Sequence, residues 1–144
     1  MYRVSNNGFT GYTPMVKEIE VFSDQGCSKM AVAKYVDDSG TSYGMDDGSV
    51  AFDGKYGTQW RPECSYANMC FKNEAWVSFS TYEEARCIVA NNLGKDAIGT
   101  SVWNNGINVE LQNSDGSWRM VMTSHENNSA VLGILTKHSL CDCF

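Results

Sequence analysis

The sequence lacks the marks of several protein classes. Its 11 lysine and arginine residues form no cluster and its net charge is −6, so the basic footprint of nucleic-acid-binding proteins is missing. No apolar run approaches the roughly 18 residues of a membrane-spanning helix, which predicts a soluble chain without a membrane span. The chain begins without a basic segment followed by an apolar one, so we expect no signal peptide within it.

Sustained helical periodicity is also missing, and short alternating runs take its place. In residues 17–22, Ile19 and Val21 alternate with Glu18 and Glu20, as in a half-buried strand. We expect strands at 2–5, 17–22, 30–36, 75–79, 85–90, 108–112, 118–122 and 131–135. The aspartate-rich segment 37–48 is expected to be a solvated loop, with a metal-binding loop as the alternative. Asp115-Gly116 between two alternating runs predicts a hairpin. Together they predict one all-β domain spanning residues 1–144, an antiparallel sandwich or barrel.

The six cysteines include no CxxC pair. An even number in a turn-rich chain indicates disulfides and an extracellular, secreted or luminal location, although a zinc site at His138, Cys141 and Cys143 is an alternative. Cys64 and Cys70 are separated by a short loop, so we predict that they pair. Cys141 and Cys143 are too close in sequence to pair readily with each other. At least one of them is therefore expected to reach Cys27 or Cys87.

The segment AFDGKYGTQW, residues 51–60, predicts a tight turn in which Gly54 and Gly57 supply positive φ angles and Trp60 closes the turn. The Asp53 carboxylate, the Thr58 hydroxyl and nearby backbone carbonyls are oxygen ligands of the kind that calcium prefers. The same groups can equally form a hydrogen-bonded knot without an ion. The local residues leave both interpretations open.

Little in the sequence indicates catalysis. No Ser-His-Asp or Cys-His arrangement has a recognisable motif around it, and the side chains of the adjacent Glu83 and Glu84 would diverge on a strand. A binding role fits better. Trp103 stands in a polar loop, where its ring can stack on a sugar or contact a protein, and Arg61, Tyr43 and Tyr66 in flanking loops can bind sugar hydroxyls. Trp118 follows the Asp-Gly hairpin, where an aromatic side chain usually packs across the sheet, so we expect it in the core.

Four motifs in order, AFDGKYGTQW, AWVSF, ARCIVA and VELQNSDGSWRMV, resemble the discoidin or coagulation factor V–VIII type C family, in a cysteine-bearing variety. The resemblance implies a galactose-binding-like jelly roll, a β-sandwich of about eight strands whose loops at one end bind galactosides and other glycans, phospholipid head groups or proteins. It places Trp60 and Trp76 at buried core positions. It also implies a structural calcium ion at Asp53 and Thr58, although Lys55 departs from the acidic residue or asparagine often found in calcium-binding members. We therefore expect a non-catalytic carbohydrate-binding module, or else a structural subunit that binds a protein partner in an extracellular or luminal complex.

Overall fold

The structure of the chain is a computed structural model. It describes residues 1–8, 15–42, 44, 46–55, 57–65, 69–91, 106–123 and 131–134, with the backbone alone for residue 91 and for 131–134. Within these residues there are eight strands and no α-helix, so the predicted all-β class is confirmed. The strands are β1 (Tyr2–Asn6), β2 (Glu18–Phe22), β3 (Ala33–Asp38), β4 (Trp76–Thr81), β5 (Cys87–Asn91), β6 (Ile107–Gln112), β7 (Trp118–Thr123) and β8 (Val131–Ile134).

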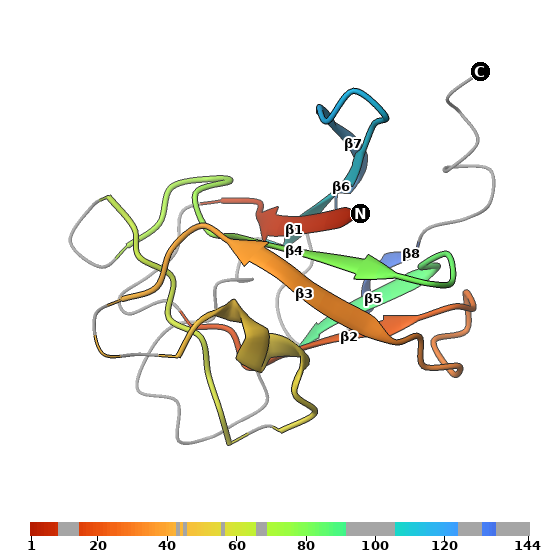
Figure 1. Cartoon of the computed structure of the whole chain (residues 1–144), viewed down its shortest axis with the longest axis horizontal. Helices are drawn as coiled ribbons and strands as arrows, with labels where there is room; N and C mark the ends of the chain where they lie inside the picture. The colour runs from red at the N-terminus through yellow and green to blue at the C-terminus, as the bar shows by residue number, and fades with distance from the viewer. Residues whose placement is uncertain are drawn as a thin grey trace.

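The strands form two antiparallel sheets (Figure 1). A five-stranded sheet has the order β3-β4-β1-β6-β7, and a three-stranded sheet has the order β2-β5-β8. Sheet neighbours are mostly far apart in sequence: β1 pairs with both β4 and β6, and β2 pairs with β5. Such non-local pairing brings segments from both halves of the chain to the same end of the molecule.

The hydrophobic core lies between the two sheets. The large sheet contributes fully buried residues such as Val4, Phe79 and Val109, and the small sheet contributes Ile19 and Ile88. Alternation along the strands places these side chains on the inner faces, as the period-two pattern of the sequence predicts. The core is therefore that of a two-layered, sandwich-like protein.

Both ends of the predicted loop at 37–48 belong to regular secondary structure. β3 continues to Asp38, and a short 3-10 helix, η1 (Gly48–Phe52), follows. The Asp38 carboxylate accepts hydrogen bonds from the backbone amides of Gly40 and Gly48 and from the Tyr35 hydroxyl. One half-buried carboxylate thus joins the end of β3 to the start of η1. Periodicity could not reveal this link because its hydrogen bonds involve single residues.

Among the described residues, no helix is long and apolar enough to cross a membrane.

Candidate functional site

Two segments of the predicted binding loops, residues 40–42 and 61–63, lie where β3 ends and β4 begins. Thr41 and Pro62 form an isolated antiparallel bridge, and the Ser42 amide donates a hydrogen bond of 2.9 Å to the Arg61 carbonyl. The Glu63 amide similarly donates to the Gly40 carbonyl at 3.0 Å. The segments 40–42 and 61–63 are therefore held together by their backbones.

Arg61 is half-buried, and Gln59 contacts its guanidinium group. With the Gln59 side-chain amide turned so that its oxygen faces the guanidinium group, this oxygen accepts hydrogen bonds from Arg61 Nε at 3.2 Å and Nη2 at 3.1 Å. Between these two residues in sequence, Trp60 is fully buried, and its indole donates to the Thr41 hydroxyl at 3.0 Å. Trp60 is thus a core residue, as predicted, and it supports the loop that carries Arg61.

A disulfide closes the next loop. Cys64 and Cys70 are bonded with a Cα–Cα distance of 5.0 Å, so the predicted pairing of these two residues is confirmed. The Glu74 carboxylate accepts hydrogen bonds from the amide and hydroxyl of Ser65 and from the Phe71 amide. The two ends of this loop are therefore fixed by a covalent bond and by one shared carboxylate.

The hydrogen bonds of three asparagines near these loops, Asn6, Asn73 and Asn108, were not predicted from the sequence. The Asn6 side chain accepts from the Ala75 amide and donates to the Phe71 carbonyl at 2.8 Å. Asn73 has a left-handed backbone, with φ of 65°, and its side-chain oxygen accepts from Asn108 at 2.6 Å. Asn6 and Asn108 are fully or almost fully buried. Buried amides satisfied in this way specify one arrangement of the strand ends.

Of the four residues predicted to contact a ligand, Arg61 alone lies among those that the structure describes. Tyr43, Tyr66 and Trp103 lie outside the described residues. In sequence, however, Tyr43 follows Ser42, whose amide binds Arg61, and Tyr66 belongs to the loop that the disulfide closes.

The Asp53 turn is closed by its own hydrogen bonds. Asp53 accepts from the Lys55 amide at 2.8 Å and from the Thr58 hydroxyl at 2.7 Å, so the two predicted ligand residues are in contact. Gly54 has a φ of 73°, as predicted, whereas Gly57 is not among the described glycines with positive φ. The prediction of a two-glycine turn is therefore wrong for Gly57.

Glu18 on β2 lies beneath this turn, although alternation had placed it on the solvent side of its strand. Its side chain is buried, and Oε1 accepts a hydrogen bond from the Gly54 amide at 3.1 Å. Its other oxygen, Oε2, is buried without a hydrogen-bond partner among the described residues. Burial, and then the nearby Asp53 and Glu20 carboxylates, raise the pKa of Glu18 to about 7.

The donor set of the turn fits calcium. The carboxylates of Asp53 and Glu18, the Thr58 hydroxyl and the Lys55 carbonyl are all hard oxygen ligands, and the buried Oε2 of Glu18 has an unused lone pair. Within the described part of the chain, no three His, Cys, Asp or Glu side chains come together as metal ligands. A cation at this turn would therefore depend on two carboxylates with hydroxyl and carbonyl oxygens.

A second disulfide joins Cys27 to Cys87, with a Cα–Cα distance of 5.5 Å. The prediction that Cys27 or Cys87 bonds Cys141 or Cys143 is therefore wrong. The reason is the pairing of β2 with β5, which places Phe22 opposite Cys87 and brings the turn after β2 next to β5. Cys141, Cys143 and the alternative zinc ligand His138 lie outside the described residues.

Trp76 and Trp118 lie on the outer face of the five-stranded sheet, so their predicted place in the core is wrong. Both are half-buried, and the Arg3 guanidinium lies over both rings, 5.5 Å from the Trp76 centroid and 4.5 Å from that of Trp118. Arg3 also forms an ion pair with Glu110 at 2.5 Å. This face therefore carries a cation–π cluster across four strands.

In comparisons with known proteins, no family model, no curated protein and no solved structure matched this chain.

Proposed function

We propose that this protein is a non-catalytic module that binds a glycan through loops at one end of a jelly-roll β-sandwich. The observation that carries the proposal is the joined pair of loops at the end of β3. The Ser42 amide binds the Arg61 carbonyl, and the following loop is closed by the Cys64–Cys70 disulfide. Loops fixed in this way lose less conformational freedom when a ligand binds, and loops on a rigid scaffold commonly carry binding residues.

The residue types around these loops suit a sugar. The guanidinium group of Arg61 can donate to sugar hydroxyls or ring oxygens, and the tyrosine and tryptophan rings offer flat apolar faces. Tyr43, Tyr66 and Trp103 are the proposed aromatic partners. In this proposal the asparagines beneath the loops keep the strand ends in place while the loops contact the ligand.

The order of motifs and the two-sheet architecture support membership in the discoidin-like group of jelly rolls. The proposed calcium ion would stabilise the Asp53 turn, with Asp53 and Thr58 as ligands and Glu18 as a further one from β2. When bound, the ion would neutralise the two neighbouring carboxylates and tie the turn to the small sheet.

The two disulfides are consistent with an oxidising compartment. We accordingly place the protein outside the cell or in a lumen, where glycans are abundant.

One observation favours the second candidate, a structural subunit that binds a protein partner. Met30, Val32 and Val36 are 62%, 74% and 44% exposed, and their even spacing along an extended segment places them on one side of it. Exposed apolar side chains grouped in this way are typical of protein contacts.

A glycan array separates the two candidates. Binding that is lost in Trp103→Ala and in Arg61→Ala, but kept in Arg86→Ala, supports the glycan module, because Arg86 directly precedes β5 and lies outside the proposed loops. The assembly subunit is supported if the folded wild-type protein binds no glycan on the array and stably captures a protein partner, and if Val32→Ser weakens that capture.

A further inference from the structure

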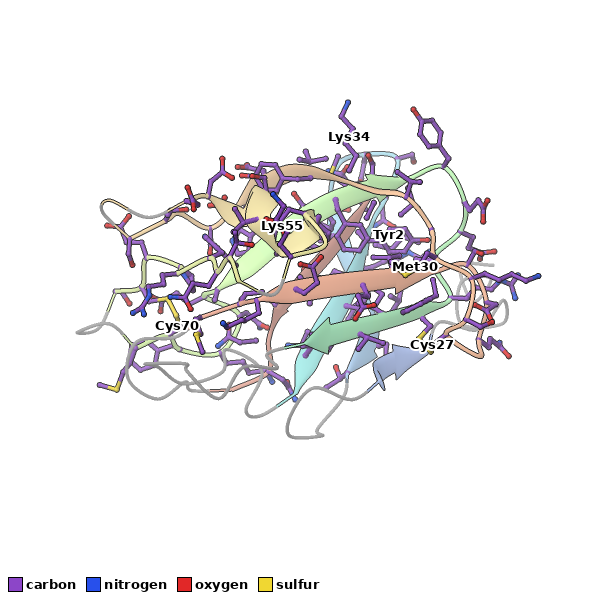
Figure 2. The ribbon with its side chains drawn as sticks, turned by 90° about the horizontal axis from the view of Figure 1, so that it is seen from below. Tyr2, Cys27, Met30, Lys34, Lys55 and Cys70 are labelled. Atoms are coloured by element: carbon purple, nitrogen blue, oxygen red, sulfur yellow. A yellow bond between two sulfur atoms is a disulfide. The ribbon has the colours of Figure 1, made fainter. Side chains whose placement is uncertain are left out.

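A cleft lies at the opposite end of the β3–β4 pair from the Arg61 loops. It has a volume of about 330 Å³ and is lined by Lys34, Ser80, Thr81 and Tyr82. Lys34 is near the start of β3, and its strand partner is Ser80 near the end of β4. Directly paired residues project from the same face of a sheet, so the side chains of Lys34 and Ser80 leave the sheet next to each other. Figure 2 shows Lys34 extending from the ribbon toward the outside of the molecule.

The polar groups of the cleft are available to a ligand. Neither the Lys34 ammonium nor the Ser80 hydroxyl has a hydrogen-bond or ion-pair partner within the described parts of the chain. The Thr81 hydroxyl donates to the Glu83 carbonyl at 2.5 Å, which leaves its oxygen free to accept. The cleft therefore offers a cation, a hydroxyl donor and a hydroxyl acceptor.

One of the residues that line the cleft, Tyr82, carries a large exposed ring. Tyr82 is 97% exposed, so almost all of its apolar ring is in contact with water. Covering that ring with a ligand would remove apolar surface from water, which is favourable. Tyr82 follows Ser80 by two positions and lines the same cleft as Lys34.

These groups discriminate among ligand classes. A phosphate or sulfate ion would use the ammonium and hydroxyls but leave the Tyr82 ring exposed. A neutral sugar could stack on the ring without needing the ammonium. A sugar that carries a carboxylate uses both, because its ring packs on Tyr82 while its carboxylate accepts from Lys34 in a charge-assisted hydrogen bond.

We propose that the cleft formed by Lys34, Ser80, Thr81 and Tyr82 is a second binding site, for a sugar residue that bears a carboxylate. Lys34 binds the carboxylate, Tyr82 packs on the sugar ring, and Ser80 and Thr81 bind ring hydroxyls. Two kinds of sugar share this chemistry, uronic acids and sialic acids. The site is separate from the loops around Arg61, so either proposal can fail without the other.

The test is a titration of the ¹⁵N-labelled protein followed by NMR, because each site then reports through its own amides. The probes are glucuronic acid, N-acetylneuraminic acid, glucose and inorganic phosphate. We expect the acidic sugars to shift the amides of residues 34 and 80–82 saturably, with glucose and phosphate binding at least about tenfold more weakly. The better of the two acids distinguishes a uronic from a sialic ligand.

Variants of exposed residues assign the contacts without disturbing the core. Lys34→Gln should weaken the acidic sugar about tenfold, the loss expected for one charge-assisted hydrogen bond, and leave glucose unchanged. Tyr82→Ala should weaken both sugars. The matched control is Lys72→Gln, which removes another exposed lysine outside the cleft and should change neither affinity. Unchanged melting temperatures confirm that the variants are folded.

Several outcomes overturn the proposal. If the acidic sugars shift only amides near Arg61, or shift no amides at all, no acidic sugar binds in this cleft. Equal affinities for glucose and glucuronic acid, or a Lys34→Gln protein that binds the acid as tightly as the wild type, remove the role of the ammonium. Phosphate that binds as well as the acidic sugars, with no effect of Tyr82→Ala, leaves an anion site and no sugar site.

Discussion

The backbone amide of Gly54 donates a hydrogen bond of 3.1 Å to the carboxyl group of Glu18, which lies 36 positions earlier in the chain. This bond joins the Asp53 turn to β2 of the small sheet. It also places a buried carboxyl group close to the Asp53 carboxylate. The stability of the turn should therefore depend both on protons and on cations.

The first prediction concerns pH. The pKa of Glu18 is raised to about 7 in the folded protein, so the folded state binds the proton more tightly than the unfolded state. Its contribution to stability is complete below about pH 4.5 and is lost as the pH rises through 7. In chelator-containing buffer, the free energy of unfolding should fall by at most about 3 kcal/mol between pH 4.5 and pH 8, at ~1.4 kcal/mol per pKa unit.

Glu18→Gln is the control for this prediction, because glutamine keeps an oxygen for the Gly54 amide and carries no charge. In urea unfolding, the free energy of unfolding of this variant should lack the fall between pH 4.5 and pH 8 that is assigned to Glu18. The variant should therefore be more stable than the wild type at pH 8. Asp24, whose pKa is lowered to about 2 mainly by the hydrogen bond from Ser28, titrates below this window. Identical pH profiles for the two proteins would contradict the assignment to Glu18.

The second prediction concerns calcium. A ligand that binds only the folded state raises the melting temperature by mass action, so adding chelator at pH 7.5 should lower it. Asp53→Ala should abolish the difference. Because a proton and the cation compete for the Glu18 carboxylate, the effect of chelator should also shrink at pH 5. A melting temperature indifferent to chelator at both pH values would leave the turn as a hydrogen-bonded knot.

The third prediction compares two tryptophans. Trp60 is fully buried, so Trp60→Ala should destabilise the protein by about 3–5 kcal/mol. Trp76 lies on the outer face of the large sheet, where the Arg3 guanidinium contacts its ring. Trp76→Ala should therefore lose less, about 1–2 kcal/mol, from partial burial and one cation–π contact. If denaturant unfolding shows the same loss of stability for both variants, Trp76 is a core residue and its assignment to the outer face is wrong.

The fourth prediction concerns the two disulfides. The Cys27–Cys87 bond spans 60 positions and the Cys64–Cys70 bond spans 6. On the chain-entropy estimate, they contribute about 4 and about 2 kcal/mol respectively. Replacing Cys27 and Cys87 by alanine should therefore destabilise the protein more than replacing Cys64 and Cys70. Peptide mapping without reductant should recover each of these pairs, and recovery of Cys27 bound to Cys141 or Cys143 would contradict the structure.

Much of the strand pattern was predictable because alternation is a local property. Residues 17–22 and 108–112 form strands within a residue of their predicted bounds. Alternation along residues 75–79 puts Trp76 on the face opposite Val77 and Phe79, and these two side chains are fully buried. The expectation that Trp76 is a core residue came from the family resemblance, and it was wrong.

The features that the sequence did not reveal are contacts between distant segments. Glu18 looked solvent-facing because periodicity does not report that a turn from residues 53–54 covers it. The Cys27–Cys87 bond required the pairing of β2 with β5. The role of Asn73 depends on its left-handed backbone and on its hydrogen bond to Asn108, and neither leaves a periodic signal in the sequence.

The two outer strands of the large sheet, β3 and β7, share one irregularity. The pairing of each with its neighbour contains a shift in register. In the β3–β4 pair the shift lies between Tyr35 and Asp37, and in the β6–β7 pair it lies between Val109 and Glu110 of β6. A bulge increases local twist and interrupts the regular spacing of backbone donors and acceptors. A second molecule therefore finds no flat, continuous ladder to extend, which protects the sheet from edge-to-edge aggregation despite the exposed Val32 and Val36 in and next to β3.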